Sequence, residues 1–205
     1  FYTPSEVSRI LAKIIGINNT NSTGQTTAYD PTCGSGSLLL KLSDEAEKQI
    51  SLYGQEKENV TAGLAKMNMI LHDNSTAEIW ADSTLSNPHW LNGGDLKTFD
   101  YVVANPPFSI KNWTTVVSTD NDKYNRFDGY GVPPEKNGDY TFLLHIIKSL
   151  KSNGKGAVIL PHGVLFRGNS EGEIRKNILK KGLIKGIVGL PANLFYGTGI
   201  PACII

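Results

Sequence analysis

The sequence predicts an α/β fold in which helices cover both faces of a mostly parallel sheet. Short apolar runs alternate with helical patterns along the chain, as in folds built from strand–helix–strand units. A turn with two glycines follows the first apolar run, and acidic residues end the next two. The 205 residues are enough for one domain with a substantial core.

Five helices are expected from the spacing of apolar residues. The first has a capping-box pattern at Thr3 to Glu6, with Pro4 at the first helical position and Gly16 as a stop. Its apolar face is expected to comprise Val7, Ile10, Leu11, Ile14 and Ile15. The other four are expected at residues 37–49, 59–71, 139–150 and 170–181.

Seven strands are expected, at residues 27–30, 52–55, 78–81, 101–104, 156–160, 187–190 and 202–205. Residues 110–138 form a long connection without an element of their own, which is more often functional or mobile than structural. Its aromatic and basic residues alternate, so it either contacts DNA or is simply a packed loop. These residues are Lys111, Trp113, Lys123, Tyr124, Arg126, Phe127 and Tyr130.

Composition limits the classes of function. The net charge is +1, whereas a free-standing nucleic-acid binder is usually more basic, so any DNA contact is expected to need partners. No apolar run approaches the roughly 20 residues of a membrane span, and no signal peptide is visible. The two cysteines, Cys33 and Cys203, suit a reducing cytosol, and we expect a cytoplasmic protein. Because the chain begins without Met and ends in an apolar run, it is expected to be a domain of a longer protein.

The glycine turn is the first candidate site. Two glycines between a strand and a helix let backbone amides approach a ligand at the helix N-terminus. Asp30 before them would repel a phosphate and favour a cation, and neither the P-loop nor the dinucleotide pattern is complete. S-adenosylmethionine carries an ammonium, a sulfonium and a carboxylate, and it fits this turn; the alternative is an ordinary tight turn. The candidate cofactor contacts are Asp30, Thr32, Cys33, Gly34, Ser35 and Gly36.

Two acidic residues stand at the carboxyl ends of the next two strands. In open α/β sheets the ligand binds at that edge. Glu56 is expected to accept hydrogen bonds from two ribose hydroxyls, and Asp82 from an adenine amino group. The alternative for each is a helix cap.

Residues 105–108 carry the strongest signal. Asn105 supplies a side-chain amide, and Pro106 and Pro107 fix the backbone without donating hydrogen bonds. Phe108 adds an aromatic face, so the turn is suited to gripping a planar amine; the alternative is a Pro-Pro loop with an Asn turn. The four histidines lack metal-ligand spacing, and no metal site is expected.

These motifs resemble those of a known family. Residues 1–4 are similar to its N-terminal motif at the cofactor carboxylate, residues 30–36 to its glycine motif, and residues 53–56 to its ribose-binding strand end. Residues 105–108 resemble its catalytic motif, and residues 160–168 and 189–201 are more specific to it. The chain thus resembles the methyltransferase domain of the modification subunit of type I restriction-modification systems, which are adenine-N6 DNA methyltransferases.

The resemblance implies an S-adenosylmethionine-dependent methyltransferase (Rossmann-like) fold over residues 1–205, with seven strands of which the last is antiparallel. It implies S-adenosyl-L-methionine as cofactor and a flipped adenine in DNA as substrate. It also implies helical regions before and after the domain, and assembly of two modification subunits with one specificity subunit and an optional restriction subunit. Its expected cofactor contacts at the N-terminus are Phe1, Tyr2, Thr3, Pro4 and Ser5, and its catalytic residues Asn105, Pro106, Pro107 and Phe108.

Other functions remain open. Cytosine N4 and the amide of a protein glutamine present a similar planar NH₂ group, so either could be the acceptor. A protein of another class, a non-catalytic scaffold that keeps the fold, is the further alternative.

Overall fold

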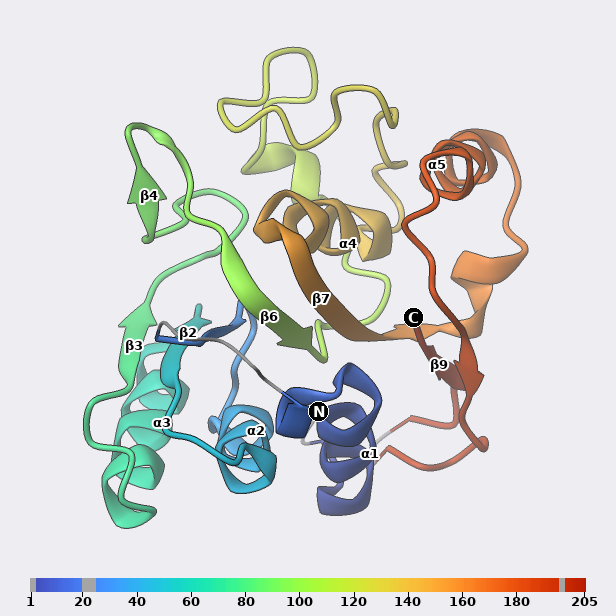
Figure 1. Ribbon diagram of the computed structural model, residues 1–205. Helices are drawn as coiled ribbons and strands as arrows, with labels where there is room; N and C mark the ends of the chain where they lie inside the picture. The colour runs from blue at the N-terminus through green and yellow to red at the C-terminus, as the bar shows by residue number, and fades with distance from the viewer. Residues whose placement is uncertain (1–2, 20–24, 196–197) are drawn as a thin grey trace.

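The computed structural model describes residues 3–19, 25–195 and 198–205, so the expectations for Phe1 and Tyr2 lie outside the described residues. Its main sheet has the strand order β3-β2-β1-β6-β7-β9-β8 (Figure 1). The strands are β1 (Thr27–Asp30), β2 (Ser51–Glu56), β3 (Glu78–Ala81), β6 (Phe99–Ala104), β7 (Leu150–Pro161), β8 (Val188–Gly189) and β9 (Ala202–Ile204).

The strand directions confirm the predicted sheet. All pairs from β3 through β7 are parallel, and β9 runs antiparallel to both β7 and β8. A small hairpin of β4 (Leu91–Asn92) and β5 (Asp95–Leu96) was not predicted, since two-residue strands carry no periodic signal.

Helices cover both faces of the sheet, as expected. On one face lie α1 (Ser5–Ile15), α2 (Ser37–Glu45) and α3 (Asn59–Leu71), and on the other α4 (Asp139–Lys148) and α5 (Asn169–Lys180) (Figure 1). Side chains of β6 alternate between them: Tyr101 and Val103 join the first core, and Val102 and Ala104 the second. Short 3-10 turns lie at Ile17–Asn19, Trp113–Thr115 and His162–Leu165.

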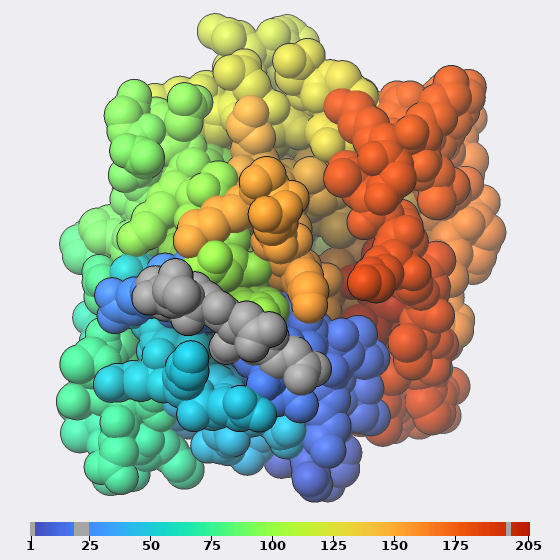
Figure 2. Space-filling model, in the orientation of Figure 1, coloured from blue at the N-terminus to red at the C-terminus, as the bar shows by residue number. Residues whose placement is uncertain are grey.

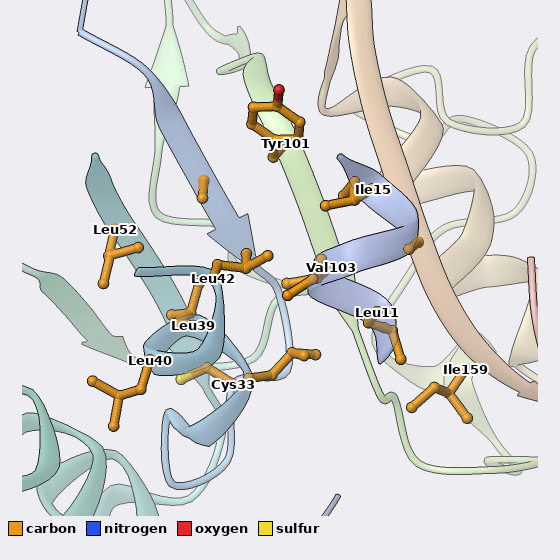
Figure 3. Close-up of a cluster of buried hydrophobic side chains, with 14 of the residues drawn as sticks. Leu11, Ile15, Cys33, Leu39, Leu40, Leu42, Leu52, Tyr101, Val103 and Ile159 are labelled. Atoms are coloured by element: carbon orange, nitrogen blue, oxygen red, sulfur yellow. The ribbon is translucent and has the colours of Figure 1, made fainter. Parts of the chain in front are cut away.

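The first core fixes the helices that flank the glycine turn. Leu39 and Leu42 of α2 and Leu11 of α1 gather over Val103 (Figure 3), and all four are fully buried. Fully burying a side chain of this size stabilises a fold by about 1.5–3 kcal/mol. The core therefore holds the N-terminus of α2 in one place relative to β6.

Helix α1 differs from its prediction at its start and on its buried face. The capping box is absent: Pro4 is the N-cap and makes no side-chain cap hydrogen bond. Ile10 and Ile14 are 41% and 49% exposed, because the helix packs through a stripe that includes small residues. The buried stripe is Val7, Ser8, Leu11, Ala12 and Ile15.

Several other boundaries moved, and two of them moved furthest. Helix α2 ends at Glu45 rather than near residue 49, since Ala46 is already extended on the way to the buried Ile50. Strand β7 begins at Leu150, which was expected to end a helix. Leu150 pairs with Phe99, beyond an irregularity in the register that the sequence pattern does not reveal.

The long connection of residues 110–138 is a packed loop at its aromatic residues. Trp113, Tyr124 and Phe127 are buried, which supports the packed-loop alternative for these residues, whereas Lys111 and Lys123 are exposed. Arg126 is also buried, forms an ion pair with Asp122 at 2.6 Å and donates a hydrogen bond to the Leu85 carbonyl. Figure 2 shows this loop (yellow) along the top of the molecule.

None of the helices in the described part of the chain has the length and apolar content needed to cross a membrane. Cys33 and Cys203 are both buried free thiols.

Replacing Asp122 by alanine tests whether the long loop is part of the folded core. The change leaves the Arg126 guanidinium buried without its carboxylate, which typically costs about 3–5 kcal/mol. We expect a loss of that size in the free energy of unfolding measured by urea denaturation.

The matched control is Glu173→Ala, which removes an exposed ion pair with Lys176. Exposed pairs contribute at most about 1 kcal/mol. Equal small losses in the two variants would contradict the anchoring role of Arg126.

Candidate active site

The glycine turn joins β1 to α2 and is held by backbone hydrogen bonds. The Gly36 amide donates to the Cys33 carbonyl at 2.7 Å, and the Cys33 amide donates to the Gln55 carbonyl at the end of β2 at 3.0 Å. Gly36 has φ 81°, and a Cβ there would lie 2.6 Å from Met69 Cε. The left-handed backbone angle is therefore what favours glycine at this position, since the flexible end of Met69 could move aside.

Asp30 ends β1 with its carboxyl group buried beneath this turn. The Thr32 amide donates to Asp30 Oδ1 at 2.9 Å. Burial raises the pKa of Asp30 to about 7, and the negative charge of Glu56 also raises it. A cation placed nearby would therefore stabilise the ionised form of Asp30.

Glu56 ends β2 and faces the same turn. Its Oε2 accepts from the Gly34 amide and its Oε1 from the Glu58 amide, both at 3.0 Å. Each carboxylate oxygen has a further lone pair, so Glu56 can also accept from two ligand hydroxyls.

Asp82 follows β3, but its carboxylate is engaged within its own turn. The Ser83 amide donates to Oδ1 and the Asn87 side chain to Oδ2, both at 2.6 Å. The fully buried Gln55 holds the same turn by accepting from the His89 amide and donating to the Asn87 carbonyl. Asp82 thus shapes a loop of the site, and its side chain lines neither of the cavities described below.

Asn105 lies directly after β6, the strand beside β1. Its Nδ2 donates to the Thr3 hydroxyl at 2.9 Å, and its Oδ1 accepts no hydrogen bond within the described residues. Pro106 is buried and Pro107 exposed. Phe108 is half-buried and packs edge-to-face on Phe195, with ring centroids 5.9 Å apart.

Two cavities meet at this edge of the sheet. The larger has a volume of about 780 Å³ and is lined by residues of segments 31–34, 56–61, 83–86, 105–107 and 110–116, with Phe142. The smaller, of about 30 Å³, lies against the glycine turn. Three residues line both cavities: Thr32, Gly34 and Asn105.

The structure brings most of the predicted site residues together. The small cavity is lined by Thr3, Asp30, Cys33, Ser35 and the three shared residues, and the large one by Glu56, Pro106 and Pro107. Gly36 holds the turn from behind, while Pro4, Ser5, Asp82 and Phe108 line neither cavity. Cys33 is buried, which together with the charge of Asp30 raises the pKa of its thiol and makes it a poor nucleophile.

Sequence reasoning missed much of the wall of the large cavity. Lys57, Glu58 and Thr61 line it where α3 begins, and residues 83–86 line it after β3. Their position directly after strand ends was the available signal. Within the described residues no group of three or more His, Cys, Asp or Glu side chains is arranged to hold a metal ion.

A sheet of this order, with a glycine turn after β1 and a polar turn after β6, defines the fold class of S-adenosylmethionine-dependent methyltransferases. A solved structure from Listeria monocytogenes, described as a putative class I S-adenosylmethionine-dependent methyltransferase, has a TM-score of 0.72 at 15% identity and covers 98% of this chain and 59% of that chain. More narrowly, the chain belongs to the N-6 DNA methylase family, whose model matches residues 1–205.

Relatives within the family are methylase subunits of type I restriction enzymes. The chain is 34% identical to the MjaVII subunit of Methanocaldococcus jannaschii, covering 100% of this chain and 35% of the relative. It is 35% identical to the MpnII subunit of Mycoplasma pneumoniae, covering 100% of this chain and 39% of the relative. The chain therefore spans well under half the length of these relatives.

A solved structure supports the same assignment. The type I restriction-modification system methyltransferase subunit from Streptococcus thermophilus has a TM-score of 0.88 and 38% identity, covering 100% of this chain and 44% of that chain. The family and fold implied by the sequence motifs are confirmed.

The buried Asp30 predicts a pH dependence of stability. Its pKa is about 7 in the folded protein, whereas an exposed aspartate titrates at about 4. Between these values the folded state holds a proton that the unfolded state has lost, so the free energy of unfolding falls as pH rises from about 4 to 7. Because one unit of pKa corresponds to about 1.4 kcal/mol, the loss is at most about 4 kcal/mol.

Urea denaturation of the parent and of Asp30→Asn across this pH range measures the effect. Asparagine does not titrate, so the stability of the parent relative to that of Asp30→Asn should fall as pH rises and level off above pH 7. A constant difference would show that Asp30 titrates normally in the folded protein.

Proposed function

We propose that this protein transfers a methyl group from S-adenosyl-L-methionine to the N6 amino group of adenine in DNA, as the modification subunit of a type I restriction-modification complex. Residues 1–205 are proposed to form its methyltransferase domain. The observation that carries the proposal is the position of Asn105, which lines both the small cavity beside the glycine turn and the large cavity. An amine held by Asn105 would thus lie beside a donor bound at the turn.

The residues at the turn fit the proposed cofactor. The small cavity is bounded by Asp30, whose carboxyl group favours a neighbouring cation such as the ammonium of the methionine part. The space at Gly34 is open, with no atom within 4 Å of a Cβ built there, so a ligand can approach the backbone closely. Glu56 faces the large cavity and can accept from ribose hydroxyls. The cofactor, when bound, supplies an electrophilic methyl group on a good leaving group.

Asn105 and Pro106 are proposed to prepare the acceptor. The lone pair of the adenine N6 is conjugated with the ring, which makes the nitrogen a poor nucleophile. Hydrogen bonds from its two N–H groups to Asn105 Oδ1 and to the Pro106 carbonyl would orient the nitrogen and favour a more tetrahedral geometry. The Thr3 hydroxyl supports this role, because it accepts from Asn105 Nδ2 and so keeps the amide oxygen for the substrate. Catalysis then rests on positioning and electrostatics.

Phe108 is proposed to hold the target base. A base inside a duplex is out of reach, so the adenine must be flipped out of the helix. Phe108 follows the two prolines, and its edge-to-face contact with Phe195 supports the ring from one side. Stacking of a base on an aromatic ring contributes about 1–3 kcal/mol.

Partners are proposed to supply recognition of the DNA sequence. The net charge of this chain is only +1, so the domain by itself is expected to bind DNA only weakly. We propose assembly with a second modification subunit and a specificity subunit, to which a restriction subunit can be added.

Transfer of labelled methyl groups by the full-length protein with its partner subunits tests the proposal. Digestion of the product and chromatography should identify N6-methyladenine. N4-methylcytosine or methylated glutamine would instead establish the corresponding acceptor. Cofactor binding without transfer to any acceptor would identify a scaffold.

Asn105→Ala should abolish most methyl transfer and leave cofactor affinity unchanged. Removing one preorganised polar contact of this kind costs on the order of 10²–10³ in rate. Methylation rate and calorimetric cofactor affinity are measured in parallel.

Asn177→Ala is the matched control, since Asn177 donates to the Tyr130 carbonyl and lines neither cavity. It should keep the parental rate. Near-normal turnover in Asn105→Ala would remove the central claim, and loss of cofactor binding would assign Asn105 to the donor pocket or to the fold.

A further inference from the structure

The polypeptide that leaves the Asn105 turn is fastened to the N-terminus of α4. The Ser109 amide donates to Asp139 Oδ1 at 2.6 Å, and the Ser109 hydroxyl lies 3.4 Å from Asp139 Oδ2. In the opposite sense, the Gly138 amide donates to the Ile110 carbonyl at 2.9 Å. Ser109 and Ile110, which directly follow residues 105–108, are thus hydrogen-bonded to Asp139 and Gly138.

This fastening holds a backbone conformation that the chain would not keep by itself. Ser109 has φ 51°, in the left-handed region that residues other than glycine rarely adopt. A Cβ at position 138 would lie 2.4 Å from Ile110 Cγ2, so Gly138 is needed for the two segments to come this close. The geometry of the turn therefore depends on tertiary contacts with α4.

Asp139 is itself held in place by an arginine. Its side chain is 1% exposed, and Arg167 Nη1 donates both to Asp139 Oδ2 and to Glu171 Oε1, at 2.9 Å each. Arg175 donates to the carbonyls of Arg167 and Val164 at 3.0 Å, which fixes the segment that carries the arginine. One oxygen of Asp139 thus serves the Ser109 amide and the other the ion pair.

We propose that Asp139 is a positioning residue for the methyl-transfer reaction, because its carboxylate accepts the Ser109 amide and thereby fixes the Asn105 turn and the cavity wall that follows it. This inference rests on the function proposed above. Asp139 lines neither cavity, so it acts through Ser109 and does not touch the substrate. Residues 110–113, which continue from Ser109, line the large cavity.

Positioning matters here because the proposed transfer depends on holding the acceptor nitrogen in line with the methyl group of the donor. A displacement of about 1 Å in a reacting group can cost on the order of 10²-fold in rate. Releasing Ser109 would let the turn relax toward an ordinary backbone conformation, and Asn105 Oδ1 would move with it. The cofactor contacts at Asp30 and Glu56 belong to other strands and should be unaffected.

Three variants of the full-length protein, assembled with its partner subunits, separate positioning from folding. Asp139→Ala removes both the acceptor and the ion pair. Asp139→Asn removes the ion pair but keeps a carbonyl oxygen that can accept from Ser109. Glu171→Gln is the matched control, since it disturbs the same arginine without touching the turn. Each is assayed for kcat, cofactor affinity and melting temperature, and for fluorescence of 2-aminopurine placed at the target adenine.

We expect Asp139→Ala to lower kcat about 10²-fold with cofactor affinity unchanged, and to reduce the 2-aminopurine signal of the flipped base. Asp139→Asn should melt at a temperature similar to that of Asp139→Ala yet recover about tenfold in kcat, and Glu171→Gln should keep the parental kcat. Equal activity of the alanine and asparagine variants, or equal loss in Glu171→Gln, would overturn the inference, as would loss of cofactor binding. If the parent assembly itself fails to methylate adenine, the proposed function fails instead.

Discussion

The parallel pairing of β1 with β6 is the constraint on which the site depends. The strand order reverses at β1, which has β2 on one side and β6 on the other, and ligands bind at such switch points in open α/β sheets. The pairing is fastened at the amino ends of the strands, where Asp100 accepts from the Thr27 amide and hydroxyl and from Lys151. Although partial burial opposes it, these hydrogen bonds hold the pKa of Asp100 below its usual range. The glycine turn and the Asn105 turn consequently share one edge.

The features that the sequence predicted are those encoded within a few residues. The glycine turn and residues 105–108 end apolar strands, so their location followed from the strand pattern alone. The features that it did not predict depend on contacts between distant segments. The helical pattern alone predicts that Ile10 and Ile14 are core residues. Which face of α1 is buried depends on how the helix packs against the rest of the fold, and the buried face is the one that contains Ser8. The sequence pattern made Arg126 a candidate DNA contact, but in the folded protein its guanidinium is bound by the Asp122 carboxylate and the Leu85 carbonyl.

Three buried polar side chains, Gln55, Arg126 and Asp139, organise the loops around the site. Gln55 holds the loop after β3, Arg126 attaches the long loop to that same loop, and Asp139 holds the exit from the Asn105 turn. Each is hydrogen-bonded, as burial of a polar group requires. Satisfied networks of this kind specify one arrangement and are costly to break in part. Loops that would otherwise be mobile can therefore line a cavity of defined shape.

The glycine-turn end of the site, where the donor is proposed to bind, is built instead from acidic groups that destabilise one another. The carboxyl group of Asp30 is buried near the charge of Glu56, and burial raises its pKa to about 7. Near neutral pH the protein therefore either carries an unfavourable negative charge or holds a proton that an exposed aspartate would lose. A cationic ligand at the turn would relieve this cost, so part of its binding free energy would come from removing the unfavourable burial of the Asp30 charge. The Asn105 end, by contrast, is neutral and held rigidly by hydrogen bonds to Thr3 and, through Ser109, to Asp139. This difference suits the proposed function, in which a charged donor is captured and a neutral amine is oriented.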